Sequence, residues 1–407
     1  MKGLFRYQHG LAVLLGLTFG VVMFDRGAIN FLAPFILKDL PLSNAQVGVA
    51  ASVVAVSWAM SGLVVGRLSD RVGRRKPFLL GAVVLFSLCS IATGLVGGFV
   101  ALVLVRLAMG LGEGPVPAMS TALNLGHSSD DRRGFNIGLF AFFTGLVGST
   151  LAPLILVNWA TNFGWRAAFF LAGVPGLAVA AVIALVVREA PRANAAVAVE
   201  TPGSPLQILR IRNVWLCAVV ASLLLASWLV AQVFLPLYLV RVRHLSPVDM
   251  GVVMTAYGVV GLVGALVLPT LSDHVGRKPV LAVFASSAVL IPMACAWWTG
   301  GVAGLALLCG VGALGSALPH VAIGMAPGES VRPADRGTAL GLVMGVAEIC
   351  GGFGGPSLAG IAADHVGLEI TPVIAGACGL AAALLSLFLL ESAPRRARAF
   401  AAAVQSA

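Results

Sequence analysis

The stretch that decides the fold is "GRLSDRVGRRKP", residues 66–77, which places five cations and one aspartate within twelve residues. The chain around it carries little charge: of 407 residues, 59% are hydrophobic and only 10% are charged. Soluble domains carry about 25% charged residues. Apolar runs of about 20 residues, the length that spans a bilayer, recur along nearly the whole chain. The composition therefore predicts an all-α membrane protein whose short charged loops separate membrane-spanning helices.

Twelve spans are expected from the apolar runs. The widest gap between them, 188–213, is rich in Pro, Ala and charge, which is typical of a flexible linker. We therefore predict an N-terminal half of six helices (1–187), a linker (188–213) and a C-terminal half of six helices with a short tail (214–407). The expected spans are 10–37, 45–67, 78–97, 99–123, 135–158, 167–187, 214–240, 248–271, 279–298, 302–325, 337–360 and 367–390.

The loop charges predict an orientation. If both termini lie on one side, that side carries 20 of the 26 Lys and Arg residues, while the opposite side carries four. The excess of cations in cytoplasmic loops then places both termini and the linker in the cytoplasm, in a multi-pass protein of the cell inner membrane. The net charge of +10 is explained by these loops, so it does not indicate a nucleic-acid partner.

The loop stretch also belongs to an internal repeat. "LSDRVGRRKP" at 68–77 returns as "LSDHVGRKP" at 271–279, and its aspartates, Asp70 and Asp273, are separated by 203 residues. The same offset maps "RRG" at 132–134 onto "DRG" at 335–337. Six spans return the chain to its starting side, so the two halves have parallel topology. In transporters built this way the substrate site lies between the repeats near the midplane.

With the loop motif after the second span and "RLAMGLGEG" at 106–114, the chain resembles the major facilitator superfamily of transporters over essentially its whole length. In that family the loop aspartate and arginines form a cytoplasmic latch that holds the halves in the outward-facing state. The alternative is that these charges serve only as topology signals. The resemblance assigns the latch to Asp70, Arg71, Gly73 and Arg74, with Asp273 and Arg277 as the second-half counterparts.

Three further stretches resemble the anion:cation symporter group of this superfamily: "FDRGAINFLAP" at 24–34, "GEGPVPA" at 112–118 and "FGWRAAFFLAGVPG" at 163–176. Members of that group move organic anions such as sugar acids, often with protons. Spinster-like lipid transporters share the Asp-Arg and Glu pattern, so a lipid or amphipathic-drug transporter is the alternative. Some anion transporters carry a second arginine in span seven. This chain has none there, which argues against a dianionic substrate.

Five ionisable side chains are expected at membrane depth, where such groups are costly and usually functional. They are Asp25, Arg26, Arg106, Glu113 and Glu348. The planar fork of Arg26 suits a bidentate grip on a substrate carboxylate. The alternative for Arg26 is a permanent salt bridge to Asp25 or Glu113.

Asp25 and Glu113 are the candidate proton sites. Desolvation favours the neutral form of a carboxyl group and a nearby arginine favours the charged form, so the two effects can balance. The matching carboxylates of the resembled symporters carry the coupled proton, although one of them is a structural partner in the alternative interpretation. Arg106 precedes Glu113 by seven residues and so points the same way along the helix. We expect Arg106 to be a structural cation that tunes the proton site rather than a substrate ligand.

The second half lacks these charges, because the repeat offset maps Asp25 onto Trp228 and Glu113 onto Ser316. Proton and anion chemistry is therefore expected in the first half, while the second half supplies shape and hydrogen bonds. Polar residues expected to contact substrate, or else to join helices, are Asn30, Gln232 and Tyr257. His320 is interpreted as a contact between helices, and Glu348 as either a cavity-lining or a hydrogen-bonded structural residue.

Several function classes lack their sequence signals. No GxxxxGK loop for ATP phosphates occurs, the six cysteines form no CxxC pair, and no Ser/His/Asp or metal-ligand constellation is visible. We therefore predict no enzyme activity, no cofactor and no metal. The sequence favours a proton-coupled symporter of a small organic anion that works as a monomer in the lipid bilayer by alternating access.

Overall fold

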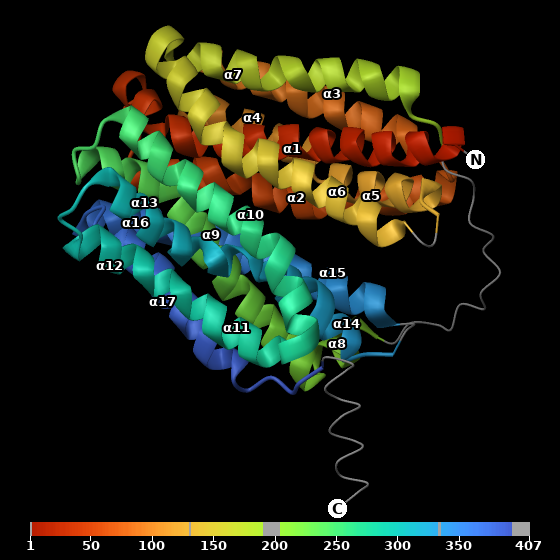
Figure 1. The fold of residues 1–407 in the computed structure, drawn as a ribbon. Coiled ribbons are helices and arrows are strands. Elements are labelled where there is room, and N and C mark those ends of the chain that lie inside the picture. Colours follow the sequence, from red (N-terminus) through yellow and green to blue (C-terminus); the bar gives the residue numbers. More distant parts are fainter. Residues whose placement is uncertain (1, 130–131, 190–203, 333–334, 393–407) are drawn as a thin grey trace, which may run out of the picture. The chain divides into compact units, whose positions relative to one another are not determined.

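A computed structural model describes residues 2–129, 132–189, 204–332 and 335–392, without the side chains of residues 2–6 and 70 (Figure 1). The chain divides into two compact units, which are described separately. The first unit comprises Met1–Ala195 and Pro236–Thr255, and the second comprises Ala196–Leu235 and Ala256–Ala407.

All regular elements in the described residues are helical. The helices up to residue 189 belong to the first unit. They are α1 (Lys2–Asp39), α2 (Asn44–Val72), α3 (Lys76–Thr93), α4 (Phe99–Glu113), α5 (Pro115–His127), α6 (Arg133–Gly145), the π-helical η1 (Leu146–Leu151) and α7 (Ala152–Val186).

The described residues from 204 onward continue the helical pattern. α9 and α10 each contribute residues to both units. The elements are α8 (Pro205–Leu209), α9 (Arg212–Arg241), α10 (Pro247–Val275), α11 (Arg277–Ser286), η2 (Ser287–Val289), α12 (Leu290–Trp297), α13 (Val302–Gly312), η3 (Ala313–Ala317), η4 (His320–Met325), α14 (Ala326–Glu329), α15 (Arg336–Val346), η6 (Ala347–Phe353), α16 (Gly354–Val366) and α17 (Ile370–Ser386).

The helix lengths match the predicted number of spans. Among the described residues, ten segments are long and apolar enough to cross a membrane. One of them, Arg133–Val186, has 54 residues and contains two spans, because the chain leaves helical geometry at Gly164. Ile370–Ser386 adds a shorter apolar helix of 17 residues. The predicted all-α class with twelve spans is therefore confirmed.

The predicted linker is only partly described. Within 188–213, residues 190–203 lie outside the described residues. The remainder contains α8, whose Ile208 is buried in the core of the second unit, and the first residues of α9. From Pro205 onward this part of the segment is thus mostly helical, and its side chains are largely exposed apart from Ile208 and Asn213.

The backbone repeats the 203-residue offset that the sequence predicts. The described glycines with positive φ are Gly73 (69°), Gly164 (81°), Gly276 (118°) and Gly367 (107°), and they form two pairs at that offset. A side chain would be strained in this region of φ. The amide of Gly73 closes α2 on the Ser69 carbonyl at 2.8 Å, as the Gly276 amide closes α10 on Ser272 at 3.1 Å. The two halves therefore share their turns as well as their spans.

In the first unit, α1 packs against α6 and α7, while α3 packs against α4 and α7 (Figure 1). Its core gathers apolar side chains from α1, α3, α4 and α7, with Leu15, Leu79, Phe86 and Met109 among the fully buried ones. In the second unit, α17 packs against α11, η2 and α12. The helix contacts of the first unit bury three ionisable side chains, Asp25, Arg106 and Glu113, beside its apolar core.

Candidate functional site

The glycines of "RLAMGLGEG" bring α4 close to its neighbours. A Cβ atom on Gly110 would lie 2.6 Å from the Val54 carbonyl oxygen, and one on Gly114 would lie 2.4 Å from that of Trp58, both on α2. On the opposite side, a Cβ on Gly112 would lie 2.8 Å from the Phe86 backbone nitrogen of α3. Small residues allow this close approach of membrane helices. α4 is thereby held between α2 and α3, with its charged side chains enclosed.

Arg106 and Glu113, at the two ends of this stretch, both have 0% of their surface exposed. The Nη1 of Arg106 contacts the Met109 sulfur at 3.2 Å, and its Nη2 donates to the Arg26 carbonyl at 3.4 Å. Arg106 also interacts electrostatically with Glu113 and Asp25. Arg106 is thus enclosed near both candidate proton sites, and its role in tuning them stays a prediction.

Glu113 is buried without hydrogen-bond donors. In the described part of the chain, neither of its carboxyl oxygens has a hydrogen-bond partner. Among its charged neighbours Arg26 interacts with it most strongly, followed by Asp25 and Arg106. An ionised carboxylate buried in this way would be costly, because no hydrogen-bond donor replaces its hydration.

Asp25 is also fully enclosed, and its hydrogen-bond partner lies on α3. The Ser90 hydroxyl lies 2.5 Å from Asp25 Oδ1 and 3.2 Å from the Phe169 carbonyl oxygen of α7. Asp25 Oδ2 has no hydrogen-bond partner among the described residues. The sequence did not single out Ser90, because a lone serine in an apolar helix is usually bonded to its own backbone.

Arg26 lies next to Asp25 in the sequence but is only half-buried. Its guanidinium carbon lies 4.6 Å from the centroid of the Trp58 ring, which is a cation–π contact. Asn30 follows one turn later on the same face of α1 and is buried. Arg26 thus differs from the enclosed charges in having part of its surface accessible.

The structure places the remaining candidates for substrate contact in the second unit. Gln232 is half-buried on α9 and Tyr257 is buried on α10. Glu348 is buried in the π-helical segment η6, and π-helical segments occur frequently at functional sites. His320 is exposed at the start of η4, with Nδ1 3.2 Å from the Ala317 carbonyl oxygen. The substrate roles of Gln232 and Tyr257 stay predictions.

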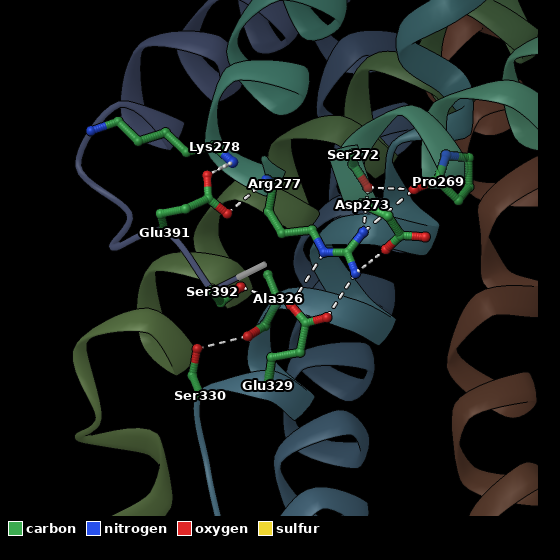
Figure 2. Close-up of polar contacts among 10 residues, drawn as sticks. All are labelled: Pro269, Ser272, Asp273, Arg277, Lys278, Ala326, Glu329, Ser330, Glu391 and Ser392. Atoms are coloured by element: carbon green, nitrogen blue, oxygen red, sulfur yellow. Dashed lines mark hydrogen bonds and ion pairs between the residues drawn. The ribbon is translucent and has the colours of Figure 1, made fainter. Parts of the chain in front are cut away.

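Of the predicted latch residues in the first half, Arg71 and Arg74 are exposed, and Gly73 forms the turn described above. The side chain of Asp70 lies outside the described residues. In the second half, Arg277 forms ion pairs of 2.7 Å with both Asp273 and Glu329 (Figure 2). These partners of Arg277 belong to its own unit, and the latch itself stays a prediction.

A glutamate that the sequence analysis missed joins this cluster. Glu391, just after α17, accepts hydrogen bonds from the backbone amides of Arg277 at 2.8 Å and Lys278 at 3.3 Å (Figure 2). The first unit repeats the arrangement: Glu189, just after α7, accepts from the amides of Arg75 at 2.6 Å and Lys76 at 3.2 Å. The signal was present in the sequence as "REAPR" at 188–192 and "ESAPR" at 391–395.

Membrane spans in repeated halves, with two carboxylates and one arginine fully enclosed in the first half, are typical of a membrane transport protein rather than an enzyme. The chain belongs to the Major Facilitator Superfamily, whose family model matches residues 15–354. It is 31% identical to the "Hexuronate transporter" of Bacillus subtilis (strain 168) over 268 residues, which are 64% of this chain and 63% of that protein.

A second relative matches over nearly the full length. The "3-(3-hydroxy-phenyl)propionate transporter" of Escherichia coli (strain K12) is 29% identical over 409 residues, covering 96% of this chain and 94% of that protein. Among solved structures, a bacterial homolog to the human lysosomal transporter Spinster, inward-facing and unoccupied, has a TM-score of 0.72. The match has 19% sequence identity and covers 94% of this chain and 95% of that one. This likeness concerns the fold alone.

Proposed function

We propose that the protein is a secondary transporter that carries a small organic anion together with protons by alternating access. The observation that supports the proposal most directly is Glu113, which is fully enclosed without hydrogen-bond donors. A carboxyl group in such a place holds a proton, since no hydrogen-bond donor replaces the hydration that the ionised form would lose. Glu113 in this conformation therefore represents the proton-loaded carrier.

Coupling between substrate and proton follows from the pairing of Arg26 with Glu113. Arg26 attracts the ionised form of Glu113 more strongly than any other charged neighbour does. An anion bound at Arg26 offsets that attraction, so it favours the protonated form of Glu113. By linkage, a proton on Glu113 favours binding of the anion to the same extent. Anion and proton therefore load and leave together.

The substrate class follows from Arg26 and from the relatives. A guanidinium donates two parallel hydrogen bonds to a carboxylate, and the ring of Trp58 holds one face of Arg26. The two relatives above are named for a hexuronate and for a phenylpropionate, both of which are carboxylates. We propose a monocarboxylate of sugar-acid type as the substrate. We further propose a monomer in the cell inner membrane with both termini in the cytoplasm.

The experiment is uptake into proteoliposomes with and without an imposed pH gradient, alongside counterflow. The probes are radiolabelled D-glucuronate and 3-(3-hydroxyphenyl)propionate. We expect the wild type to concentrate at least one of them when the gradient is imposed. Glu113→Gln and Asp25→Asn should each retain counterflow, because Arg26 is unchanged, but lose gradient-driven accumulation. In these variants no proton has to be released to reset the carrier.

Glu348→Gln is the matched control, because it neutralises a buried carboxylate of the second unit. We expect it to retain gradient-driven uptake. If both first-unit variants accumulate substrate like the wild type while Glu348→Gln fails, the proton is carried in the second unit. If wild-type vesicles take up neither acid but Arg26→Ala and wild type both transport a lysolipid, the lipid alternative replaces the proposal.

A further inference from the structure

The hydroxyl group of Ser90 lies between an acid on α1 and a backbone carbonyl on α7. We infer that Ser90 is a positioning residue for the proton of Asp25, and that its hydroxyl hydrogen changes acceptor when Asp25 binds or releases that proton. The inference rests on the proposed function, because it concerns how the Ser90 hydroxyl reorients when Asp25, a proposed proton site, gains or loses its proton. It uses only contacts within the first unit.

The Ser90 hydroxyl faces more hydrogen-bond acceptors than it has hydrogen atoms to donate. A serine hydroxyl carries one donor hydrogen and can also accept. Two acceptor atoms face it, Asp25 Oδ1 at 2.5 Å and the Phe169 carbonyl oxygen at 3.2 Å. When Asp25 is ionised, it has no hydrogen to donate, so Ser90 donates to Asp25. When Asp25 is protonated on Oδ1, Asp25 donates to Ser90, and Ser90 is free to donate to Phe169.

Asp25 has several charged or polar neighbours but hydrogen-bonds only to the Ser90 hydroxyl in the described part of the chain. α4 contributes Arg106 and Glu113, α3 contributes the Cys89 thiol beside Ser90, and α1 contributes the adjacent Arg26. α7 contributes only the Phe169 carbonyl among the polar contacts of this site. In the described part of the chain, the Ser90 hydroxyl is the one hydrogen-bond partner of the Asp25 carboxyl group.

The protonation state of Asp25 changes the hydrogen bonds that join α1, α3 and α7. In the protonated state a continuous chain of donors runs from Asp25 on α1 through Ser90 on α3 to Phe169 on α7. In the ionised state the Ser90–Phe169 hydrogen bond is lost, while the Ser90–Asp25 hydrogen bond becomes charge-assisted and stronger. Protonation of Asp25 therefore changes how α3 is held against α7, which also packs along it through Gly173 and Gly176.

The test is infrared difference spectroscopy between acidic and alkaline pH on the full-length protein reconstituted in lipid. The band of a protonated carboxyl group is assigned to Asp25 by its loss in Asp25→Asn. A hydrogen-bonded carboxylic acid absorbs at lower frequency than a free one. We therefore expect Ser90→Ala to shift the Asp25 band to higher frequency and Ser90→Thr, which keeps a hydroxyl, to restore its position.

The matched control is Ser87→Ala. Ser87 is an equally buried serine one turn earlier on α3, whose hydroxyl donates to the Val83 carbonyl of its own helix at 2.7 Å. This variant should leave the Asp25 band in place. An unshifted band in Ser90→Ala, or an equal shift in Ser87→Ala, would overturn the inference. So would the absence of any band that Asp25→Asn removes.

The spectroscopic result is separable from the transport result. If Asp25→Asn loses gradient-driven uptake while Ser90→Ala leaves the Asp25 band unshifted, the inference about Ser90 fails and the proposed function stands. If Asp25→Asn and Glu113→Gln both accumulate substrate normally, the proposed proton coupling fails whatever the band does. A shifted band in Ser90→Ala together with coupling lost in Asp25→Asn supports both.

Discussion

Arg26 is the one membrane-depth cation of the first unit that keeps part of its surface accessible, whereas Arg106 is fully enclosed. The difference arises from the helix partners. Arg106 lies on α4, which its glycines hold tightly against α2 and α3, while Arg26 lies on α1 over the face of Trp58. An enclosed arginine compensates nearby carboxylates, and an accessible one can exchange partners. The two arginines are thus suited to different tasks.

We predict that Arg26→Lys weakens binding of a carboxylate substrate at least tenfold, because lysine keeps the charge but loses the planar fork and its stacking on Trp58. A charge-assisted hydrogen bond contributes about 1.5–3 kcal/mol, which corresponds to roughly ten- to hundredfold in affinity. Arg26→Ala should abolish binding. Calorimetric titration of the purified protein with the acid that the wild type transports measures the effect.

The control for this prediction is Arg166→Lys. Arg166 is also stacked on a tryptophan, with its guanidinium carbon 4.3 Å from the Trp165 ring centroid, but it bonds the carbonyls of Gly94 and Val96. Its replacement should leave substrate affinity near the wild-type value. Near-normal affinity in Arg26→Ala would identify Arg26 as a structural cation.

At the scale of elements, the N-termini of α3 and α11 are held by glutamates that follow the last span of each half. The first amides of a helix have no partner within the helix and carry the positive end of its dipole. Glu189 and Glu391 satisfy them with charged acceptors across the unit. Each contact joins the residues after the last helix of a repeat to the loop motif of the same repeat.

We predict that Glu391→Gln accelerates hydrogen exchange at the amides of Arg277 and Lys278 by roughly fivefold. Glutamine loses the charge and one of the two oxygens that accept from these amides, and losing a cap costs about 1 kcal/mol. Glu189→Gln should have the same effect at Arg75 and Lys76. Exchange followed by mass spectrometry in detergent or nanodiscs provides the measurement. Glu369→Gln, at an exposed glutamate before α17, should leave all four amides unchanged. Unaltered exchange in both capping variants would contradict the assignment of these glutamates as caps.

For the whole molecule, the repeat extends from sequence to backbone, since the paired turns at Gly73 and Gly276 and at Gly164 and Gly367 recur at the same offset. The ionisable residues at depth do not recur in the same way. The repeat is therefore closer in the backbone than in the buried charges, because the counterparts of Asp25 and Glu113 are Trp228 and Ser316.

We predict that Asp70→Asn shifts the population toward the inward-facing state, because it removes a charge that the latch uses in one state only. Single cysteines placed at the two mouths of the carrier, labelled with a membrane-impermeant maleimide, measure the accessibility of each mouth. The inner mouth should become more reactive and the outer mouth less. Asp249→Asn, at the far end of α10 from Asp273, is the control and should resemble the wild type. Equal labelling of Asp70→Asn and wild type at both mouths would refute the latch.

The sequence by itself determined the class, the twelve spans, the repeat and the membership of the superfamily. These properties follow from local features of the sequence: hydropathy over about 20 residues, a loop motif, and glycines at turns. It also singled out Asp25, Arg106 and Glu113, because a charge in an apolar span is visible without knowing its neighbours.

Only the tertiary structure decided which of these charges are enclosed and what each one meets. Ser90 is 65 residues from Asp25 and Glu391 is 114 residues from Arg277, so no local pattern relates them. The difference between enclosed Arg106 and accessible Arg26 likewise depends on how closely α4 approaches α2 and α3. Burial and side-chain hydrogen bonding depend on how helices distant in sequence pack together. The hydropathy of one span does not specify which helices it packs against.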